Sequence, residues 1–170
     1  MCLQDYHQET GVPLGVPLIN RLTDTFPQLV VFKHEDCPGL IKLSRIRAAE
    51  RDGHRCLSIL MGNGGLYLLQ ELADGAMTGF AFPEMLVEVY DRFTSGDPES
   101  AEDVYDCYLP FLRHEQQPGF GLAIRKEVLR RRGALRSAAA RTPATRLGPI
   151  EYAELDRLLA RLERRLKDAG

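Results

Sequence analysis

The chain has 170 residues, of which 44% are hydrophobic and 27% charged, a composition typical of a globular domain and not of a disordered chain. Its 22 basic and 24 acidic residues give a net charge of −2, so the overall charge gives no reason to expect nucleic acid or an anionic membrane as a partner. The chain starts without the basic and apolar regions of a secretory signal, and no apolar run approaches the roughly 20 residues of a membrane helix, so we expect a soluble, cytoplasmic protein.

Short apolar runs alternate with helical periodicity through the first part of the chain. Apolar residues at helical spacing predict a helix over residues 18–26, which Pro27 ends. The continuous apolar run 29–32 then predicts a strand that is buried on both faces, as in parallel sheets. A second helix is expected from Leu40, and a strand over 56–61 follows it.

The same alternation continues after a glycine-rich loop. The loop, 62–65, is followed by a short helix over 66–72, a strand over 76–80 and a helix from Pro83 to about Phe93. Strands and helices that alternate with loops of a few residues indicate right-handed βαβ units and a parallel sheet.

From Gly96 onward no further strand is predicted. Helices are expected over residues 98–114, 118–132 and 151–167, and a loop rich in alanine, arginine, threonine and proline separates the second from the third. The chain is therefore predicted to be α/β first and all-α afterwards.

Four segments resemble, in order and spacing, strands of the dihydrodipicolinate synthase/N-acetylneuraminate lyase family, whose members are class I Schiff-base lyases. They resemble the family's fifth to eighth barrel strands in turn, and they are Leu3–His7 with the following Thr10–Val12, Val30–Asp36, Leu60–Gly64 and Gly75–Thr78. The terminal helices match the family's C-terminal extension in order and size. The resemblance implies an α/β fold in which residues 1–96 form a partial TIM (β/α)8 barrel (strands five to eight) and residues 97–170 a C-terminal three-helix extension. A complete barrel needs about 250 residues, and the paired threonines of the family's first half have no counterpart here.

Lys33 closes the apolar run of the second predicted strand. In the family, the lysine at this place forms an imine with a 2-keto acid, so the resemblance makes Lys33 the expected catalytic residue. An amine must be neutral to attack a carbonyl, and burial at the mouth of a barrel disfavours its charged form. The imine then serves as an electron sink when a bond forms or breaks beside it. From the spacing alone, a surface lysine that flanks a strand is the more frequent case.

The first predicted strand departs from the family at Gln4. The best-known members carry a proton-relaying tyrosine there, whereas Gln4 can hydrogen-bond a substrate but cannot act as an acid or base near neutral pH. Tyr6 points to the same face if strand alternation holds, and it is predicted to take over the catalytic role. The alternative for Tyr6 is a tyrosine packed in the core.

The other predicted contacts with the substrate come from the resemblance. Thr10, Gly62, Asn63 and Met77 match positions near the family's bound keto acid, Met77 through its backbone. The backbone N–H groups of a glycine loop can hold an anion, although many such loops are simple turns. Glu9 stands where synthases carry an arginine that binds a carboxylate, which argues against dihydrodipicolinate synthesis and favours a sugar acid or another 2-keto acid.

No metal and no organic cofactor are expected. The four cysteines form no CxxC pair, and the histidines lack the spacing of metal ligands. The three polar residues after Lys33, which are His34, Glu35 and Asp36, are expected to form a polar loop.

Two other functions stay open beside a lyase that acts on a small-molecule 2-keto acid. The chain is alternatively a catalytically incompetent fragment or assembly partner derived from such a lyase, because half a barrel leaves unpaired strand edges. A basic run between Lys126 and Arg141 resembles an electrostatic footprint for phosphate or nucleic acid, but it lacks interleaved aromatic residues and is balanced by acids elsewhere, so no nucleic-acid partner is expected. Members of the family form oligomers, and the resemblance implies a homo-oligomer here as well.

Overall fold

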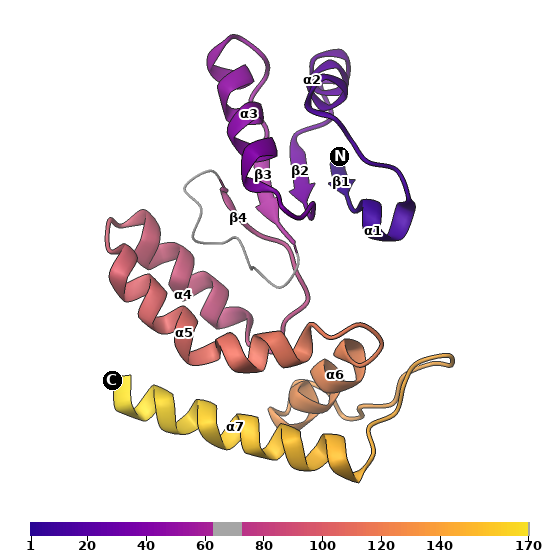
Figure 1. Cartoon of the computed structure of the whole chain (residues 1–170), viewed down its shortest axis with the longest axis vertical. Coiled ribbons are helices and arrows are strands. Elements are labelled where there is room, and N and C mark those ends of the chain that lie inside the picture. Colours follow the sequence, from indigo (N-terminus) through magenta and orange to yellow (C-terminus); the bar gives the residue numbers. More distant parts are fainter. Residues whose placement is uncertain (63–72, 170) are drawn as a thin grey trace. The chain divides into compact units, whose positions relative to one another are not determined.

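The chain divides into two compact units, Met1–Thr78 and Gly79–Gly170. The computed structural model describes residues 1–62 and 73–169 (Figure 1).

The first unit is built around a parallel sheet with the strand order β1-β2-β3-β4. The strands are β1 (Cys2–Asp5), β2 (Val31–His34), β3 (Ser58–Met61) and β4 (Gly75–Ala76). Their register aligns Gln4 with Lys33, Lys33 with Leu60 and Leu60 with Gly75. One row of residues therefore crosses the whole sheet and contains two of the predicted site residues.

Among the described residues of this unit, the strands are accompanied by the helices α1 (His7–Thr10), α2 (Val16–Thr25) and α3 (Leu40–Arg51). The apolar stripes of α2 and α3 pack with β2 and β3 in one hydrophobic core. The buried members of this core are Ile19, Leu29, Phe32, Leu43, Ile46, Leu57, Ile59 and Met61. Since side chains alternate along a strand, the residues between them point to the other face of the sheet.

Among the described residues of the first unit, that other face is the more open one. Gln4 and Ser58 are exposed on it, and Val31, Lys33 and Leu60 are half-buried. Parallel sheets normally have both faces covered. The first unit thus has the form of an incomplete barrel, with the helices outside and Lys33 on the inner side.

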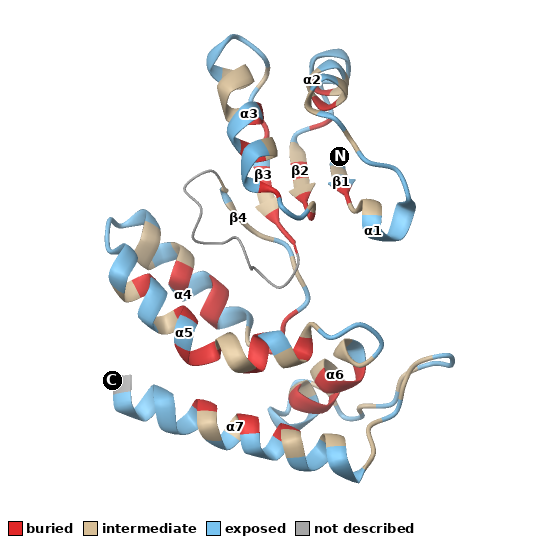
Figure 2. Cartoon of the chain, in the orientation of Figure 1, coloured by how far each residue is buried: buried red, intermediate tan, exposed pale blue. Residues whose placement is uncertain are grey.

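The second unit consists of α4 (Pro83–Thr94), α5 (Pro98–Glu115), α6 (Gly121–Arg131) and α7 (Pro149–Ala169). Helix α5 contacts each of the other three, and Figure 2 shows buried residues along its length. Asp97 caps α5 by accepting a hydrogen bond from the backbone N–H of Ser100. Phe111 of α5 makes aromatic contacts with Phe80 and Phe82, which precede α4. Among residues 79–169 the structure has no strand, as the sequence predicts.

The predicted elements differ from the observed ones mainly at the strands. The second strand occupies Val31–His34 rather than 29–32, and β4 covers only Gly75–Ala76 of the predicted 76–80. His34 is therefore part of a strand and fully buried, which corrects the expectation that it lies in a polar loop. The helix predicted over 66–72 lies outside the described residues.

The sequence predicts that the partial barrel ends at residue 96 and that the helical extension begins after it, and this boundary stays a prediction. Helix α4 belongs to the same compact unit as the later helices, because the boundary between the two units falls after Thr78. Within the described part of the chain, no helix combines the length and the apolar character that a membrane span requires.

Candidate functional site

Lys33 lies on β2, an inner strand of the sheet, one residue before the strand ends. Its side chain is 19% exposed, and its Nζ lies 2.7 Å from Oε1 of Glu35. The contact with Lys33 places the Glu35 side chain on the same face of the sheet as the lysine. In an α/β barrel, the C-terminal ends of the strands are where catalytic side chains gather.

Glu35 is held through its carboxylate and through its backbone carbonyl. The residue is only 5% exposed, and Nε2 of Gln4 donates a hydrogen bond to the same Oε1 that contacts Lys33. The side chain of Gln8 donates to the backbone carbonyl of Glu35 at 3.4 Å. We call the group formed by Gln4, Lys33 and Glu35 the amine–carboxylate cluster.

Gly62 makes room for this cluster. A Cβ atom built on Gly62 would overlap Cγ and Cδ of Glu35. The backbone N–H of Gly62 donates to the carbonyl of His34 at 2.9 Å, which fixes the turn after β3 beside the end of β2. A residue with a side chain at position 62 would displace the carboxylate from Lys33.

The other predicted site residues are dispersed. Tyr6 follows β1 as the N-cap residue of α1, with φ −125° and ψ 64°, so strand alternation does not extend to it. Burial, followed by the charges of Glu9 and Glu35, raises the pKa of the Tyr6 hydroxyl. The Thr10 hydroxyl is turned back onto its own helix, where it donates to the Tyr6 carbonyl at 3.1 Å. Met77 is 42% exposed.

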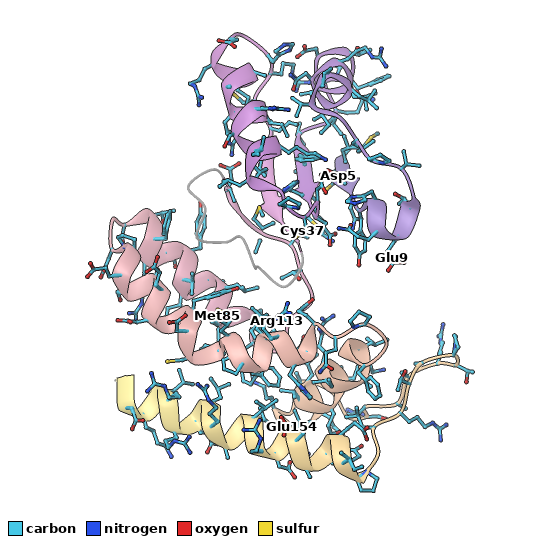
Figure 3. All side chains as sticks on the ribbon, in the orientation of Figure 1. Asp5, Glu9, Cys37, Met85, Arg113 and Glu154 are labelled. Atoms are coloured by element: carbon cyan, nitrogen blue, oxygen red, sulfur yellow. The ribbon has the colours of Figure 1, made fainter. Side chains whose placement is uncertain are left out.

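Met77 is predicted to contact the substrate through its backbone. In the structure its backbone N–H donates a hydrogen bond to the Met61 carbonyl at 2.8 Å. Asn63 lies outside the described residues. Glu9 is exposed on the short helix α1, after Asp5 at the end of β1 (Figure 3). The substrate contacts of these residues stay predictions.

A second polar network lies on the helix-facing side of the sheet. Asp5 is fully buried, and its Oδ2 accepts a hydrogen bond from Lys42 of α3 at 2.7 Å. The same Lys42 Nζ lies 2.5 Å from Oδ2 of Asp36, and His7 lies 3.4 Å from the other oxygen of that carboxylate. This network ties β1, the segment after β2 and α3 together behind the amine–carboxylate cluster.

Glu35 is a candidate site residue that the sequence does not reveal. It was expected to be part of a polar loop, but the structure buries it and pairs it with Lys33. A spacing of two residues from a strand lysine is a weak signal for a shared face, because β2 ends at His34, before Glu35. Among residues 1–62 and 73–169, no cluster of three or more histidine, cysteine or acidic residues is arranged to hold a metal ion.

Comparison with known proteins gives relatives of one kind. No family model matches the chain. An L-2-keto-3-deoxyarabonate dehydratase of Azospirillum brasilense is 29% identical over 158 residues, which make up 91% of this chain and 50% of that protein. A dihydrodipicolinate synthase structure from Rhodopseudomonas palustris is 43% identical, with a TM-score of 0.91. The match covers 94% of this chain and 55% of the synthase chain.

A third similar structure is a prophage protein of the dihydrodipicolinic acid synthase family from E. coli K12, in complex with pyruvate. It is 21% identical with a TM-score of 0.79, and 95% of this chain matches 55% of that one. The chain thus spans about half the length of the relatives it matches. These similarities confirm the predicted fold class, a partial TIM barrel with a C-terminal helical extension.

Proposed function

We propose that this chain, which corresponds to the C-terminal half of a barrel of the dihydrodipicolinate synthase family, carries the imine-forming lysine of a lyase that acts on a 2-keto acid. The observation that carries the proposal is the position of Lys33. Its amine stands on the open face near the C-terminal end of an inner strand, partly shielded from solvent and 2.7 Å from a buried carboxylate.

The proposed reaction begins with an imine between Lys33 and C2 of the keto acid. The imine withdraws electrons from C3, so a proton on C3 becomes acidic and a bond one atom further along can break or form. Both an aldol cleavage and the loss of a hydroxyl group use this electron sink. No metal or organic cofactor takes part in these steps.

The dehydration of a sugar-derived 2-keto acid is the reaction we favour within this class. The relative from Azospirillum brasilense is named as a dehydratase of a 3-deoxy sugar acid. Glu9 also supports this choice, because an exposed carboxylate on α1 would repel the second carboxylate of a dicarboxylic substrate. The name of this relative and the carboxylate of Glu9 are the two observations that support this substrate.

The test is reductive trapping. The purified chain is incubated with pyruvate or a 2-keto-3-deoxy sugar acid, borohydride is added, and the adduct is located by peptide mass spectrometry. We expect a stable adduct on Lys33 that is absent from Lys33→Ala and from Lys33→Arg, while Lys126, on α6, stays unmodified in all three proteins. Water formation or carbon–carbon cleavage from the sugar acid then separates a dehydratase from an aldolase.

A folded chain that gives no adduct with either compound would contradict this function. Circular dichroism and urea unfolding establish that the variants are folded. The same negative result would favour the alternative, a catalytically incompetent fragment or assembly partner derived from such a lyase.

A further inference from the structure

We propose that Glu35 is a catalytic residue, the carboxylate that accepts a proton from Lys33 during imine formation and returns it to the departing hydroxyl group. This inference rests on the proposed function, because it concerns the step by which the Lys33 imine forms. It goes beyond that function by assigning the proton transfer to a residue other than the predicted Tyr6.

Contact with the reacting atom is the first argument. Oε1 of Glu35 lies 2.7 Å from Nζ of Lys33, which is within hydrogen-bonding distance for a direct proton transfer. Among the described residues, Glu35 is the one acid that forms an ion pair with Lys33. A proton can therefore pass between the two groups without a relay.

Positioning of the carboxylate is the second argument. Glu35 is 5% exposed, Gln4 donates a hydrogen bond to its Oε1, and Gly62 leaves the space that its side chain occupies. A surface ion pair would leave a flexible side chain free to move, and such pairs contribute little. Here a buried side chain is held in one place next to an amine, which is how acid–base residues are arranged.

The neighbouring groups are poorly suited to the same task. Gln4 has no proton to exchange near neutral pH. Burial, followed by the charges of Glu9 and Glu35, raises the pKa of the Tyr6 hydroxyl, which disfavours the phenolate form that a base would need. The carboxylates of Asp5 and Asp36 both contact Lys42 on the helix-facing side of the sheet.

The step balances as follows. The Lys33 ammonium gives one proton to Glu35, and the lone pair of the neutral amine attacks C2 of the keto acid while the carbonyl electrons move onto oxygen. One proton then passes from the nitrogen to that oxygen, which gives a neutral carbinolamine. Glu35 returns its proton to the hydroxyl group, which leaves as water as the nitrogen lone pair forms the C=N bond. The product is a protonated imine beside a carboxylate, so the charges of the original ion pair are restored.

The test compares the rate of borohydride-trapped adduct formation with pyruvate in the wild type, Glu35→Gln, Glu35→Asp and Glu35→Ala. Glu35→Gln keeps the shape of the side chain but cannot accept a proton, and we expect it to slow the adduct by about 100-fold, at the lower end of general acid–base contributions. Its residual rate should rise steeply with pH and with buffer concentration. Glu35→Asp keeps a carboxylate, so it should be slowed less and keep the wild-type pH profile.

Chemical rescue separates a proton-transfer role from a structural one. In Glu35→Ala, added acetate or formate should accelerate the adduct in proportion to its concentration and leave the wild type unaffected. If the wild type forms the Lys33 adduct and Glu35→Gln forms it at the same rate with the same pH profile, the role of Glu35 is wrong while the proposed function stands. If the wild type forms no adduct, the proposed function itself is contradicted.

Discussion

Gly62 and Glu35 show how closely the candidate site depends on single atoms. The ideal Cβ position at Gly62 is 2.7 Å from Oε2 of Glu35, and still closer to the Cγ and Cδ atoms of that side chain. The side chain cannot occupy its observed place if residue 62 has a methyl group. Lys33 would then lose the partner that stands next to its amine.

We expect Gly62→Ala to lower the stability of the fold modestly, by about 1–3 kcal/mol, the usual cost of overpacking. The rate of adduct formation should fall further, by at least about tenfold, because proton transfer by Glu35 depends on its position next to Lys33. Trapping kinetics and urea unfolding measure the two effects. Gly15→Ala is the matched control, because the nearest atom to its Cβ lies at an ordinary 3.8 Å. Equal trapping rates for both variants would show that the place of Glu35 is unimportant.

At the scale of elements, Lys42 connects three segments of the first unit. Helix α3 presents its amine to Asp5 of β1 and to Asp36 after β2. Burial acts to lower the pKa of Lys42, but its hydrogen bonds to Asp36 and Asp5 outweigh burial and raise it. Burial likewise acts to raise the pKa of Asp36, yet the hydrogen bond and charge of Lys42 hold it below the ordinary value. Both directions mean that the folded state favours the charged pair.

Lys42→Met should therefore destabilise the fold by about 3–5 kcal/mol at neutral pH, since Asp5 is left buried without its cation. A lowered carboxyl pKa contributes stability above the ordinary value of 3.8 and loses it as the pH falls through the folded-state pKa. The difference between wild type and variant should shrink in that acid range. Urea unfolding between neutral and acid pH measures it. Arg45→Met, at an exposed position of the same helix, should change stability by less than about 0.5 kcal/mol.

The sequence predicted the helices more accurately than the strands. Helix α3 begins at Leu40 and α4 at Pro83, as expected, because helical periodicity and proline leave a clear local signal. Strand β2 begins two residues later than its apolar run, since Leu29 packs in the core before the chain enters the sheet. Strand limits follow from pairing with neighbours, which are distant in the sequence.

The candidate site was predictable in part for the same reason. Lys33 was found from the resemblance, whereas the contact between Gln4 and Glu35 joins positions 31 residues apart that only the parallel register brings together. The observation that Tyr6 leaves the strand could not be foreseen either, because alternation gives no sign of where β1 ends. The sequence therefore identifies Lys33, whereas its contact with Glu35 is seen only once the strands are paired.

At the scale of the whole molecule, the first unit presents surfaces that a closed barrel would cover. Strands β1 and β4 are the outer strands of the sheet, and unpaired outer strands tend to pair with further chains. Apolar side chains gather beside β1 in a shallow pocket lined by Met1, Leu3, Leu22, Phe26, Gln28 and Leu29. We therefore expect the first unit to associate with a second copy of this chain.

The association between copies of the chain should depend on concentration. In sedimentation velocity, the sedimentation coefficient of the 170-residue chain should rise with concentration. Phe26 is 45% exposed beside β1, and Phe26→Lys should weaken the association by about 1.4 kcal/mol, or about tenfold in the dissociation constant, because part of its apolar surface would stay in water. Ile150→Lys, at a position 81% exposed on α7, is the control and should leave the association unchanged. A reversal of the two effects would assign the contact to the terminal helix, and a wild type that stays monomeric at every concentration would rule out pairing between copies of the open half-barrel.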